Sequence, residues 1–322
     1  MRIIGTGSAL PRKIVTNDML TGFLDTSDEW ILPRTGIRSR HVISDENLED
    51  LGAEAVRKAL EMSGLKASEI DMFIVSNVVS EYITPGMSCI VAEKLGMTCP
   101  MFDINCACPG FVYALDMAET YYKAGKVKNV VIACIEEPSR MASWKDRATC
   151  VLFGDGAGAV LVEATEEEGV GYQDSFLRTD GKGLPFLHLK AGGSVCPPSH
   201  FTVDHRLHYL YQEGRAVFRF AVTAMSNDVM EILRRNSLGA DDVQWVIPHE
   251  ANMRIIEAVA RRAELPLDKV VINIDRYGNT SAATIPLALW DHEKNLKKGD
   301  QIVFTAFGAG FVHGASLYKW AY

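Results

Sequence analysis

The sequence predicts an α/β protein made of two similar halves, on the basis of an internal repeat and of buried strand patterns. Leu65, in a loop between a helix and a strand, is matched by Leu238 in an equivalent loop, an offset of 238 − 65 = 173 residues. An apolar strand around Val130 is matched by one around Ile302, an offset of 302 − 130 = 172 residues. Near-constant offsets at two well-separated places indicate that one α/β unit occurs twice.

Each copy of the repeat starts with an amphipathic helix and continues into a buried strand. The helices are expected at 51–62 and 221–235, where apolar residues recur at three- and four-residue spacing. The strands that follow are continuous apolar runs, which are typical of sheets covered by helices. No Pro- or Ser-rich linker separates the copies. We therefore expect two halves, 1–168 and 169–322, that share one extensive interface.

Two segments depart from this regular pattern. Residues 163–215 lack clear periodicity and contain Gly, Pro and His, so we expect a loop-rich insertion at about 169–215 that forms a wall or a partner surface. The run Phe153–Ala159 resembles a phosphate-binding glycine loop, but residues 160–162 after it read as a strand. Because the dinucleotide fingerprint needs its glycines to open a helix, we interpret the run as a tight turn or bulge.

Composition narrows the possible function classes. The chain has 322 residues, 48% of them hydrophobic and 23% charged, which is typical of a globular protein with a large core. Its net charge of −8 argues against general nucleic-acid binding. Neither a signal peptide nor a run of the ~18–20 apolar residues that span a bilayer is present. Seven scattered cysteines suit reduced thiols, so we expect a cytoplasmic protein without a membrane partner.

The sequence DINCACPGF at 103–111 contains the candidate nucleophile. Cys108 precedes Pro109, a residue tolerated at the first position of a helix, and a helical pattern follows. The backbone dipole at a helix N-terminus lowers the pKa of a thiol, whereas Cys106 is still in extended chain. A C-x-C pair has too few ligands to close a tetrahedral metal site, so we expect no metal. From the spacing alone, a nucleophile, a redox switch and inert core thiols all stay open.

A histidine and an asparagine in the second half strengthen the nucleophile interpretation. His249 directly follows a buried strand, where a loop would face a cleft. Asn279 lies in a polar, glycine-containing turn ahead of an apolar helix expected at 282–290. Taken alone, His249 is more often structural and Asn279 is more often a helix cap. Because of the duplication, the strand before His249 and the turn that contains Asn279 are the second-half counterparts of the elements that lead to Cys108.

The chain resembles, essentially from end to end, the β-ketoacyl-acyl carrier protein synthase III family, the initiating condensing enzymes of type II fatty-acid synthesis. The resemblance implies a thiolase-like fold with αβαβα layers and a homodimer. It implies acyl coenzyme A and acyl carrier protein as substrate and partner, and no resident cofactor. The motifs that carry it are the N-terminal signature 25–37, the nucleophile segment 103–111, the histidine segment 248–252, the turn 278–281 and the glycine turn 307–311.

A Cys-His-Asn site is also implied by the resemblance. Acyl coenzyme A would transfer its acyl group to Cys108 as a thioester, and malonyl-acyl carrier protein would then lose carbon dioxide. His249 and Asn279 would donate hydrogen bonds to the thioester oxygen as the enolate forms. The carbanion would attack the Cys108 thioester, and the backbone N–H groups of Cys108 and Ala309 would hold the resulting oxyanion.

Substrate contacts are implied in the same way. Trp30 and Arg147 match positions that sandwich the coenzyme A adenine. Thr26 and Arg34 belong to the same signature, and Asn252 matches a residue near the pantetheine arm. Four arginines match the patch that receives the acidic carrier protein, although without the resemblance they would be interpreted as solvated helix positions: Arg219, Arg254, Arg261 and Arg262.

Several positions depart from the family pattern. Pro109 stands where alanine is common, Glu250 where glutamine is common, and His313 where tryptophan is frequent. Cys106 replaces a small residue, which fits a bystander role. Thr84 occupies a position where a phenylalanine often projects across the dimer interface and limits the partner's acyl pocket.

The threonine predicts a longer or branched primer. Two further interpretations stay open: a related ketosynthase or acyltransferase of secondary metabolism, and a thiol switch built on Cys106 and Cys108.

Overall fold

The computed structural model describes all 322 residues and contains two mixed β-sheets. The strands of the first sheet are β1 (Arg2–Ala9), β4 (Met72–Ser76), β5 (Met101–Ile104), β6 (Asn129–Glu136) and β7 (Gly156–Glu163), in the order β1-β7-β6-β4-β5. Those of the second sheet are β8 (Gly171–Thr179), β11 (Trp245–Pro248), β12 (Gln301–Gly308) and β13 (Val312–Lys319), in the order β11-β12-β13-β8.

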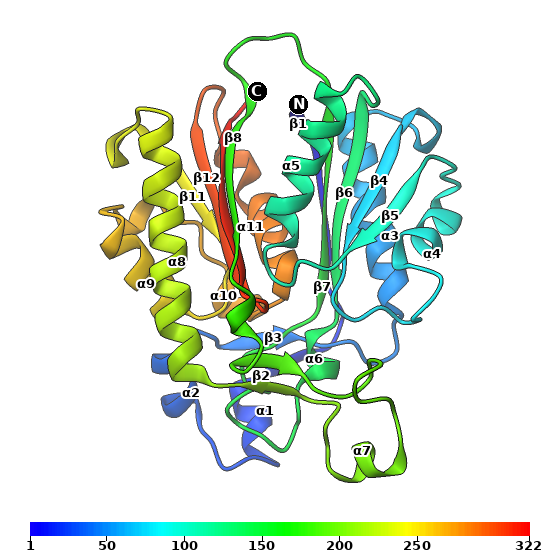
Figure 1. Ribbon diagram of the computed structural model, residues 1–322, viewed down its shortest axis with the longest axis vertical. Coiled ribbons are helices and arrows are strands. Elements are labelled where there is room, and N and C mark those ends of the chain that lie inside the picture. The colour runs from blue at the N-terminus through cyan, green and yellow to red at the C-terminus, as the bar shows by residue number, and fades with distance from the viewer.

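Helices lie between the two sheets and on the outer face of each, so the molecule has five layers (Figure 1). The central helices are α5 (Gly110–Lys123) and α11 (Thr284–His292). The outer helices are α3 (Leu48–Ser63) and α4 (Met87–Leu95) on the first sheet, and α8 (Gly214–Arg235) and α9 (Met253–Arg262) on the second. This arrangement confirms the αβαβα layers that the resemblance implies.

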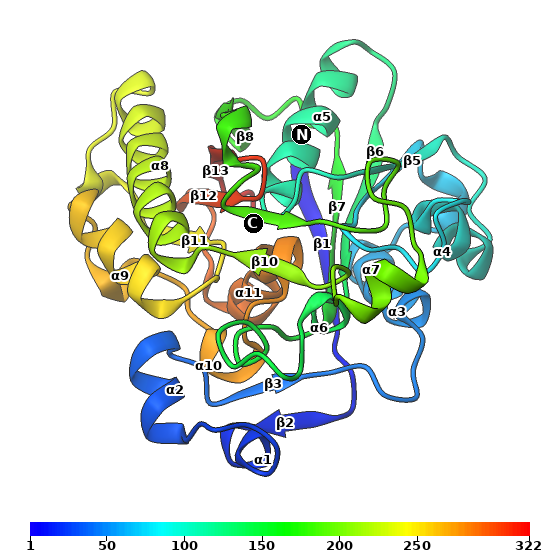
Figure 2. The same ribbon diagram turned by 60° about the horizontal axis from the view of Figure 1, so that its bottom comes forward.

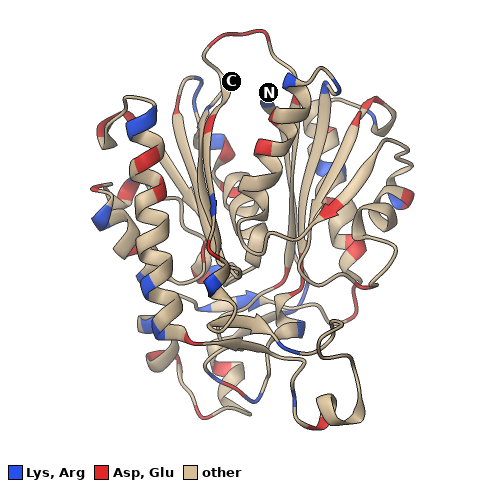
Figure 3. Cartoon of the chain, viewed as in Figure 1, with Lys and Arg blue, Asp and Glu red and all other residues tan.

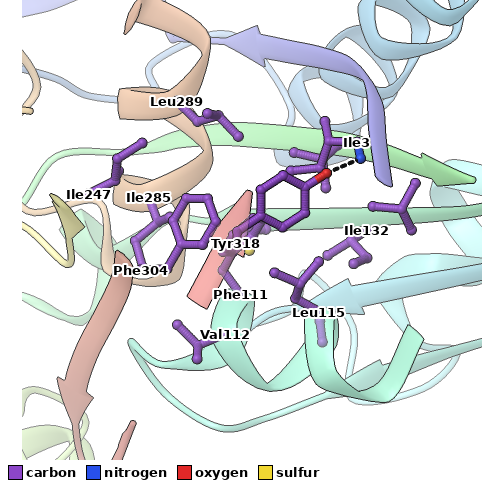
Figure 4. Close-up of a cluster of buried hydrophobic side chains, with 14 of the residues drawn as sticks. Ile3, Phe111, Val112, Leu115, Ile132, Ile247, Ile285, Leu289, Phe304 and Tyr318 are labelled. Atoms are coloured by element: carbon purple, nitrogen blue, oxygen red, sulfur yellow. Dashed lines mark hydrogen bonds between the residues drawn. The ribbon is translucent and has the colours of Figure 1, made fainter. Parts of the chain in front are cut away.

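The central layer contains the largest hydrophobic core. This core has 29 buried residues and joins the inner faces of both sheets to the central helices. Phe111 on α5 meets Phe304 on β12 edge to face, with ring centroids 5.4 Å apart. Tyr318 on β13 accepts the Ile3 N–H with its buried hydroxyl (Figure 4). Because the same core packs both sheets, the two halves bury their apolar faces against a common layer.

The two sheets repeat one topology. In the first, β4 and β6 are parallel, while β7 runs antiparallel to both β6 and β1. In the second, β11 and β12 are parallel, while β13 runs antiparallel to both β12 and β8. The offsets between equivalent strands are 245 − 72 = 173 for β4 and β11, and 301 − 129 = 172 for β6 and β12. They equal the offsets of the sequence repeat, whereas the division at residues 168 and 169 stays a prediction.

Two expectations about local structure were wrong. The region interpreted as a loop-rich insertion contains β8, which pairs with β13 along its length. β8 was missed because most of its side chains are only half-buried, and its sequence GYQDSFLRT has no continuous apolar run. Helix α8 begins at Gly214 instead of residue 221. The interpretation of the glycine run 153–159 as a tight turn or bulge was only partly correct, because Gly156–Ala159 already belong to β7.

The remaining elements cover the lower end of the layers, and Figure 2 shows β10 stretching between the end of α8 and α7. They are β2 (Ile14–Thr16), α1 (Asn17–Thr21), α2 (Asp28–Thr35), β3 (Ser39–His41), α6 (Pro138–Met141), β9 (Leu187–Leu189), α7 (His200–Asp204), β10 (Leu210–Gln212) and α10 (Ile274–Tyr277). None of the helices combines the length and the apolar composition that crossing a membrane requires.

Candidate active site

Cys108 lies in the turn between β5 and α5. Pro109 follows it, and its carbonyl accepts the Tyr113 N–H at 3.2 Å in the first turn of the helix. The turn requires a left-handed residue, and Ala107 supplies it with a φ of 50°. The end of β12 packs directly against this turn, because a Cβ at Gly308 would lie 2.8 Å from the Cys108 nitrogen. The nucleophile turn is therefore held between elements of both halves.

His249 follows β11 and is 2% exposed. Its backbone N–H donates to Thr305 O at 2.7 Å, and this bond continues the pairing of β11 with β12. On the ring, Nδ1 lies 2.9 Å from the hydroxyl oxygen of Thr284, on α11. Since Nδ1 is engaged by Thr284, Nε2 is the ring nitrogen that remains for a substrate or for the thiol.

Asn279 occupies the loop between α10 and the 3-10 turn Ser281–Ala283. Its backbone N–H donates to Leu152 O at 2.8 Å, across to the segment that precedes β7. Its side-chain oxygen accepts the Ser281 N–H at 2.9 Å. This bond fixes the orientation of the carboxamide and leaves its NH2 group as a donor.

The structure brings Cys108, His249 and Asn279 together on one cavity of about 1730 Å³. Ala309, in the turn between β12 and β13, lines the same cavity. Neither the Cys108 N–H nor the Ala309 N–H donates to another group of the chain. The cavity therefore offers one thiol, two side-chain groups able to donate, and two free backbone donors.

Burial makes the thiol and the imidazole electrically neutral. It raises the pKa of Cys108 to about 12, an effect that the Ser281 hydroxyl opposes and the carboxyl of Glu136 increases. Burial also lowers the pKa of His249 to about 4. The expectation that the helix dipole leaves Cys108 with a lowered pKa is therefore wrong, because desolvation of the thiolate outweighs other influences.

Three of the five predicted coenzyme A residues line the cavity. They are Trp30, Arg34 and Asn252, whereas Thr26 and Arg147 do not line it. Arg34 and Arg147 both stack on the Trp30 ring, at 4.8 Å and 5.0 Å from its centroid. An adenine stacked between Trp30 and Arg147 needs one van der Waals contact on each face, so the Trp30 ring and the Arg147 guanidinium must be about 7 Å apart. Arg147 must therefore move outward for the predicted sandwich to form.

The predicted carrier patch divides between the mouth and the outer surface. Arg219 on α8 and Arg254 on α9 line the cavity mouth, whereas Arg261 and Arg262 lie farther along α9. Arg262 donates to Thr223 Oγ1 at 3.3 Å and to Asn227 Oδ1 at 3.2 Å, both on α8. Figure 3 shows basic residues at the lower end of α8, the end beside the cavity.

Three other predicted or unusual positions lie away from the cavity of their own chain. Thr84 is exposed in the loop before α4 and does not line the cavity. Glu250 is fully buried, and its carboxylate accepts the Asn273 and Ile274 N–H groups at the start of α10. His313 contacts Asp228 Oδ2 through Nδ1 at 2.6 Å.

Sequence reasoning missed four residues beside the site: Glu136, Arg215, Ser281 as a contact of the nucleophile, and Thr284. Glu136 had a signal, since it is an acidic residue that ends the buried run NVVIACIE, the middle strand of the first sheet. Ser281 Oγ lies 3.7 Å from Cys108 Sγ, a contact across 173 residues that no local pattern could indicate. The contact of Thr284 with His249 is likewise purely tertiary.

Comparisons with known proteins point to one protein family. Residues 102–181 match the family model "3-Oxoacyl-[acyl-carrier-protein (ACP)] synthase III", and residues 233–320 match the C-terminal model of the same description. The chain is 50% identical to the beta-ketoacyl-[acyl-carrier-protein] synthase III of Phocaeicola vulgatus, over 99% of this chain and 96% of the relative. A relative from Bacteroides thetaiotaomicron with the name "synthase III 2" is 49% identical over the same shares.

Solved structures of similar proteins cover the whole fold. The 3-oxoacyl-[acyl-carrier-protein] synthase III of Aquifex aeolicus has a TM-score of 0.92 at 38% identity, and covers 99% of both chains. The priming β-ketosynthase of the R1128 polyketide pathway has a TM-score of 0.91 at 33% identity, over 99% of this chain and 96% of the other.

Proposed function

The chain belongs to the 3-oxoacyl-[acyl-carrier-protein] synthase III family of thiolase-like condensing enzymes, and we propose that it joins an acyl-coenzyme A primer to malonyl-acyl carrier protein. The products are 3-oxoacyl-acyl carrier protein, carbon dioxide and coenzyme A, and the reaction initiates fatty-acid synthesis. The observation that carries the proposal is the meeting of Cys108, His249, Asn279 and two free backbone N–H groups at one cavity.

The first half-reaction transfers the acyl group to Cys108. The thiol is neutral, so its proton must leave as sulfur attacks the thioester carbonyl, and the neutral imidazole of His249 accepts it at Nε2. The carbonyl oxygen becomes negative and is held by the Cys108 and Ala309 N–H groups. Coenzyme A leaves as a thiolate and takes up the proton from His249, which returns the imidazole to its neutral form.

The second half-reaction needs His249 as a donor. Loss of carbon dioxide from the malonyl group places negative charge on its thioester oxygen, and donors from His249 Nε2 and Asn279 Nδ2 stabilise that enolate. Its carbon then attacks the Cys108 thioester and releases the sulfur as a thiolate, which takes up one proton from solvent to regenerate the neutral thiol. Thr284 supports both roles of His249: its hydroxyl accepts a hydrogen bond from Nδ1–H at 2.9 Å while it donates to the Ser281 carbonyl at 3.0 Å, and it would donate to Nδ1 after turning away from that carbonyl.

The surface at the cavity mouth suits an acidic carrier protein that delivers its phosphopantetheine arm. The arginines of α8 that form ion pairs are Arg234 and Arg235, at the end of the helix away from the cavity. Arg219, beside the cavity mouth, is therefore free to bind a carboxylate of the carrier protein. Arg254 lies over the Phe218 ring at 5.9 Å. These arginines would steer the carrier despite the negative net charge of the chain.

A homodimer is supported by the free edge of the first sheet. β5 pairs with β4 on one side only, and the loop beside it exposes Ile83 at 99% and Tyr82 at 60%. An open strand next to exposed apolar side chains is suited to pairing with a second copy. In such a dimer the Thr84 loop would reach the acyl pocket of the other protomer, and the small side chain would leave room for a longer or branched primer.

A priming ketosynthase of secondary metabolism is the second candidate. It is favoured by Thr84, which predicts a wider acyl pocket than acetyl needs. The two candidates share the same chemistry at Cys108, and the primer and the carrier protein distinguish them. The interpretation as a thiol switch built on Cys106 and Cys108 stays a prediction.

Intact-mass analysis after mixing with acetyl-, branched and longer acyl-coenzyme A tests the proposal. A single acyl adduct that maps to Cys108 is expected, with the largest yield for a primer longer than acetyl. Cys106→Ser should load normally and Cys108→Ser should not load. Asn279→Ala should load but release carbon dioxide from malonyl-acyl carrier protein slowly. Loading on Cys106, or equal loss of function in both cysteine variants, would contradict the synthase proposal.

A further inference from the structure

A buried carboxyl joins the two segments that carry His249 and Asn279. Glu250 directly follows His249 and is fully buried. Its Oε2 accepts the Ile274 N–H at 2.6 Å and the Asn273 N–H at 3.0 Å. Both donors lie at the start of α10, the helix that ends just before the Asn279 turn. Glu250 therefore links the loop after β11 to α10 through a single oxygen atom.

On one side, the position of α10 determines that of Asn279. The Ile274 carbonyl accepts the Gly278 N–H at 3.0 Å, a bond that closes the single turn of this helix. Gly278 comes directly before Asn279, and a Cβ at Gly278 would lie 2.8 Å from Leu152 O. The Asn279 N–H donates to the same carbonyl oxygen at 2.8 Å. Asn279 is thus held from two sides, by α10 and by Leu152, and a shift at the start of α10 would tilt its turn.

On the other side, Glu250 shares an anchor with His249. The Glu250 N–H donates to Thr284 Oγ1 at 3.3 Å, and the same oxygen lies 2.9 Å from His249 Nδ1. The chain before α10 also runs alongside β11, because the Val271 N–H donates to Val246 O at 2.9 Å. The backbone of Glu250 is therefore fixed beside the imidazole, while its side chain reaches across to α10.

These contacts allow one side chain to position two donors. We propose that Glu250 is a positioning residue that holds His249 and Asn279 in a fixed arrangement through its two hydrogen bonds at the start of α10. The inference rests on the proposed condensation, in which both donors stabilise the enolate. A carboxyl group keeps an acceptor oxygen in its protonated and in its ionised form, so the two bonds persist in both states. An apolar side chain would leave two buried N–H groups unpaired, and the start of α10 would have to move to give them other partners.

The two proposed half-reactions depend on this arrangement to different extents. Transfer of the acyl group to Cys108 uses His249 as a base and does not use Asn279. Release of carbon dioxide needs both donors at the malonyl thioester oxygen, and loss of one oxyanion donor lowers a rate by roughly 100- to 1000-fold. Removal of the Glu250 acceptor displaces both donors, so it should slow release of carbon dioxide more than acyl loading.

Variants of Glu250, each measured in both half-reactions, test the proposal. Acyl loading is followed by quenched-flow intact mass, and release of carbon dioxide is measured with acylated protein at saturating malonyl-acyl carrier protein. Glu250→Met has a side chain of similar length without an acceptor oxygen, and its release of carbon dioxide should fall roughly tenfold more than its loading. Glu250→Gln keeps an acceptor oxygen and should leave the ratio of the two rates unchanged.

Glu250→Asp replaces Glu250→Met in the test if the latter does not fold. It keeps the carboxyl group but is one methylene shorter, so its oxygens withdraw by about 1.5 Å and cannot reach both N–H groups at their present positions. Its release of carbon dioxide should again fall more than its loading. Equal losses in both half-reactions for Glu250→Met or Glu250→Asp, or a Glu250→Gln protein as impaired as Glu250→Met, would overturn the inference.

Asp291, on α11, provides a matched control. Its carboxylate accepts hydrogen bonds from side chains of the same short helix and its first turn: Asn273, Arg276 and Tyr277. None of these bonds reaches the loop that carries His249. Asp291→Ala should therefore leave the ratio of the two rates unchanged. A selective loss of carbon dioxide release in this variant would show that any disturbance of α10 has the same effect, and it would contradict a specific role for Glu250.

The same measurements separate this inference from the proposed reaction. Failure of the unmodified chain to load Cys108, or to release carbon dioxide from malonyl-acyl carrier protein, would reject the reaction itself. Equal losses in the Glu250 variants of an active protein would reject only the positioning role of Glu250.

Discussion

A methyl group added at Gly308 should disturb the nucleophile turn directly. A Cβ at this position would lie 2.7 Å from Pro109 Cδ, 2.8 Å from the Cys108 nitrogen and 3.1 Å from Ala107 Cβ. Ordinary contact begins near 3.4 Å, so the turn would have to move by about 0.6 Å (3.4 − 2.8 Å) from β12. Overpacking of this kind costs about 1–3 kcal/mol of stability.

The same displacement should also slow the reaction at Cys108. A misplacement of about 1 Å can lower an enzymatic rate by roughly 100-fold, and the displaced group here is the Cys108 N–H that would hold the oxyanion. We expect Gly308→Ala to slow acyl loading by at least roughly tenfold, as measured by quenched-flow intact mass. Gly181→Ala is the control, because a Cβ there meets nothing within 4 Å. Loading at the unmodified rate in a folded Gly308→Ala protein would refute the reasoning.

Three further predictions concern a single side chain each. Thr284→Val removes the polar partner of His249 Nδ1. Release of carbon dioxide from malonyl-acyl carrier protein should then fall roughly tenfold more than acyl loading does, because the enolate needs His249 as a donor. Equal losses in the two rates would show that Thr284 does not set which ring nitrogen of His249 carries the proton. Thr84→Phe should shorten the longest acyl-coenzyme A that loads, because the larger side chain would narrow the acyl pocket of the other protomer; an unchanged chain-length profile would contradict its role in the pocket. Burial raises the pKa of Glu250 from 4.5 to about 8, so its contribution to stability is complete below pH 4.5 and lost as pH rises through 8. The urea concentration at the unfolding midpoint of Glu250→Gln, relative to that of the unmodified chain, should therefore be higher at pH 9 than at pH 5. A difference between the two proteins that stays constant with pH would contradict the raised pKa of Glu250.

Local patterns were sufficient for the elements that carry the candidate site. The Cys-Pro dipeptide indicates a turn into a helix, and the structure places Cys108 between β5 and α5. The strand before His249 and the basic face of α9 follow from apolar periodicity in the same way. The repeat offsets of 173 and 172 residues recur as strand offsets because each copy folds as one α/β unit.

The environment of those residues depended on contacts between distant segments. The helix position of Cys108 indicated a lowered pKa, yet packing of both halves around the turn buries the thiol and reverses the direction. β8 carries no apolar run of its own and is a strand because β13 offers it an edge.

The sequence by itself determined the order of the elements that carry the candidate site, since that order depends on residue type and local spacing. Its resemblance to a known family, and not spacing alone, pointed to Cys108, His249 and Asn279. Only the tertiary structure decided which proton donors surround Cys108. Ser281 reaches Cys108 where the two halves meet, and Thr284 reaches His249 through folding of the second half. Burial and hydrogen-bond geometry arise between segments far apart in the chain, so the pKa values at the site are properties of the fold.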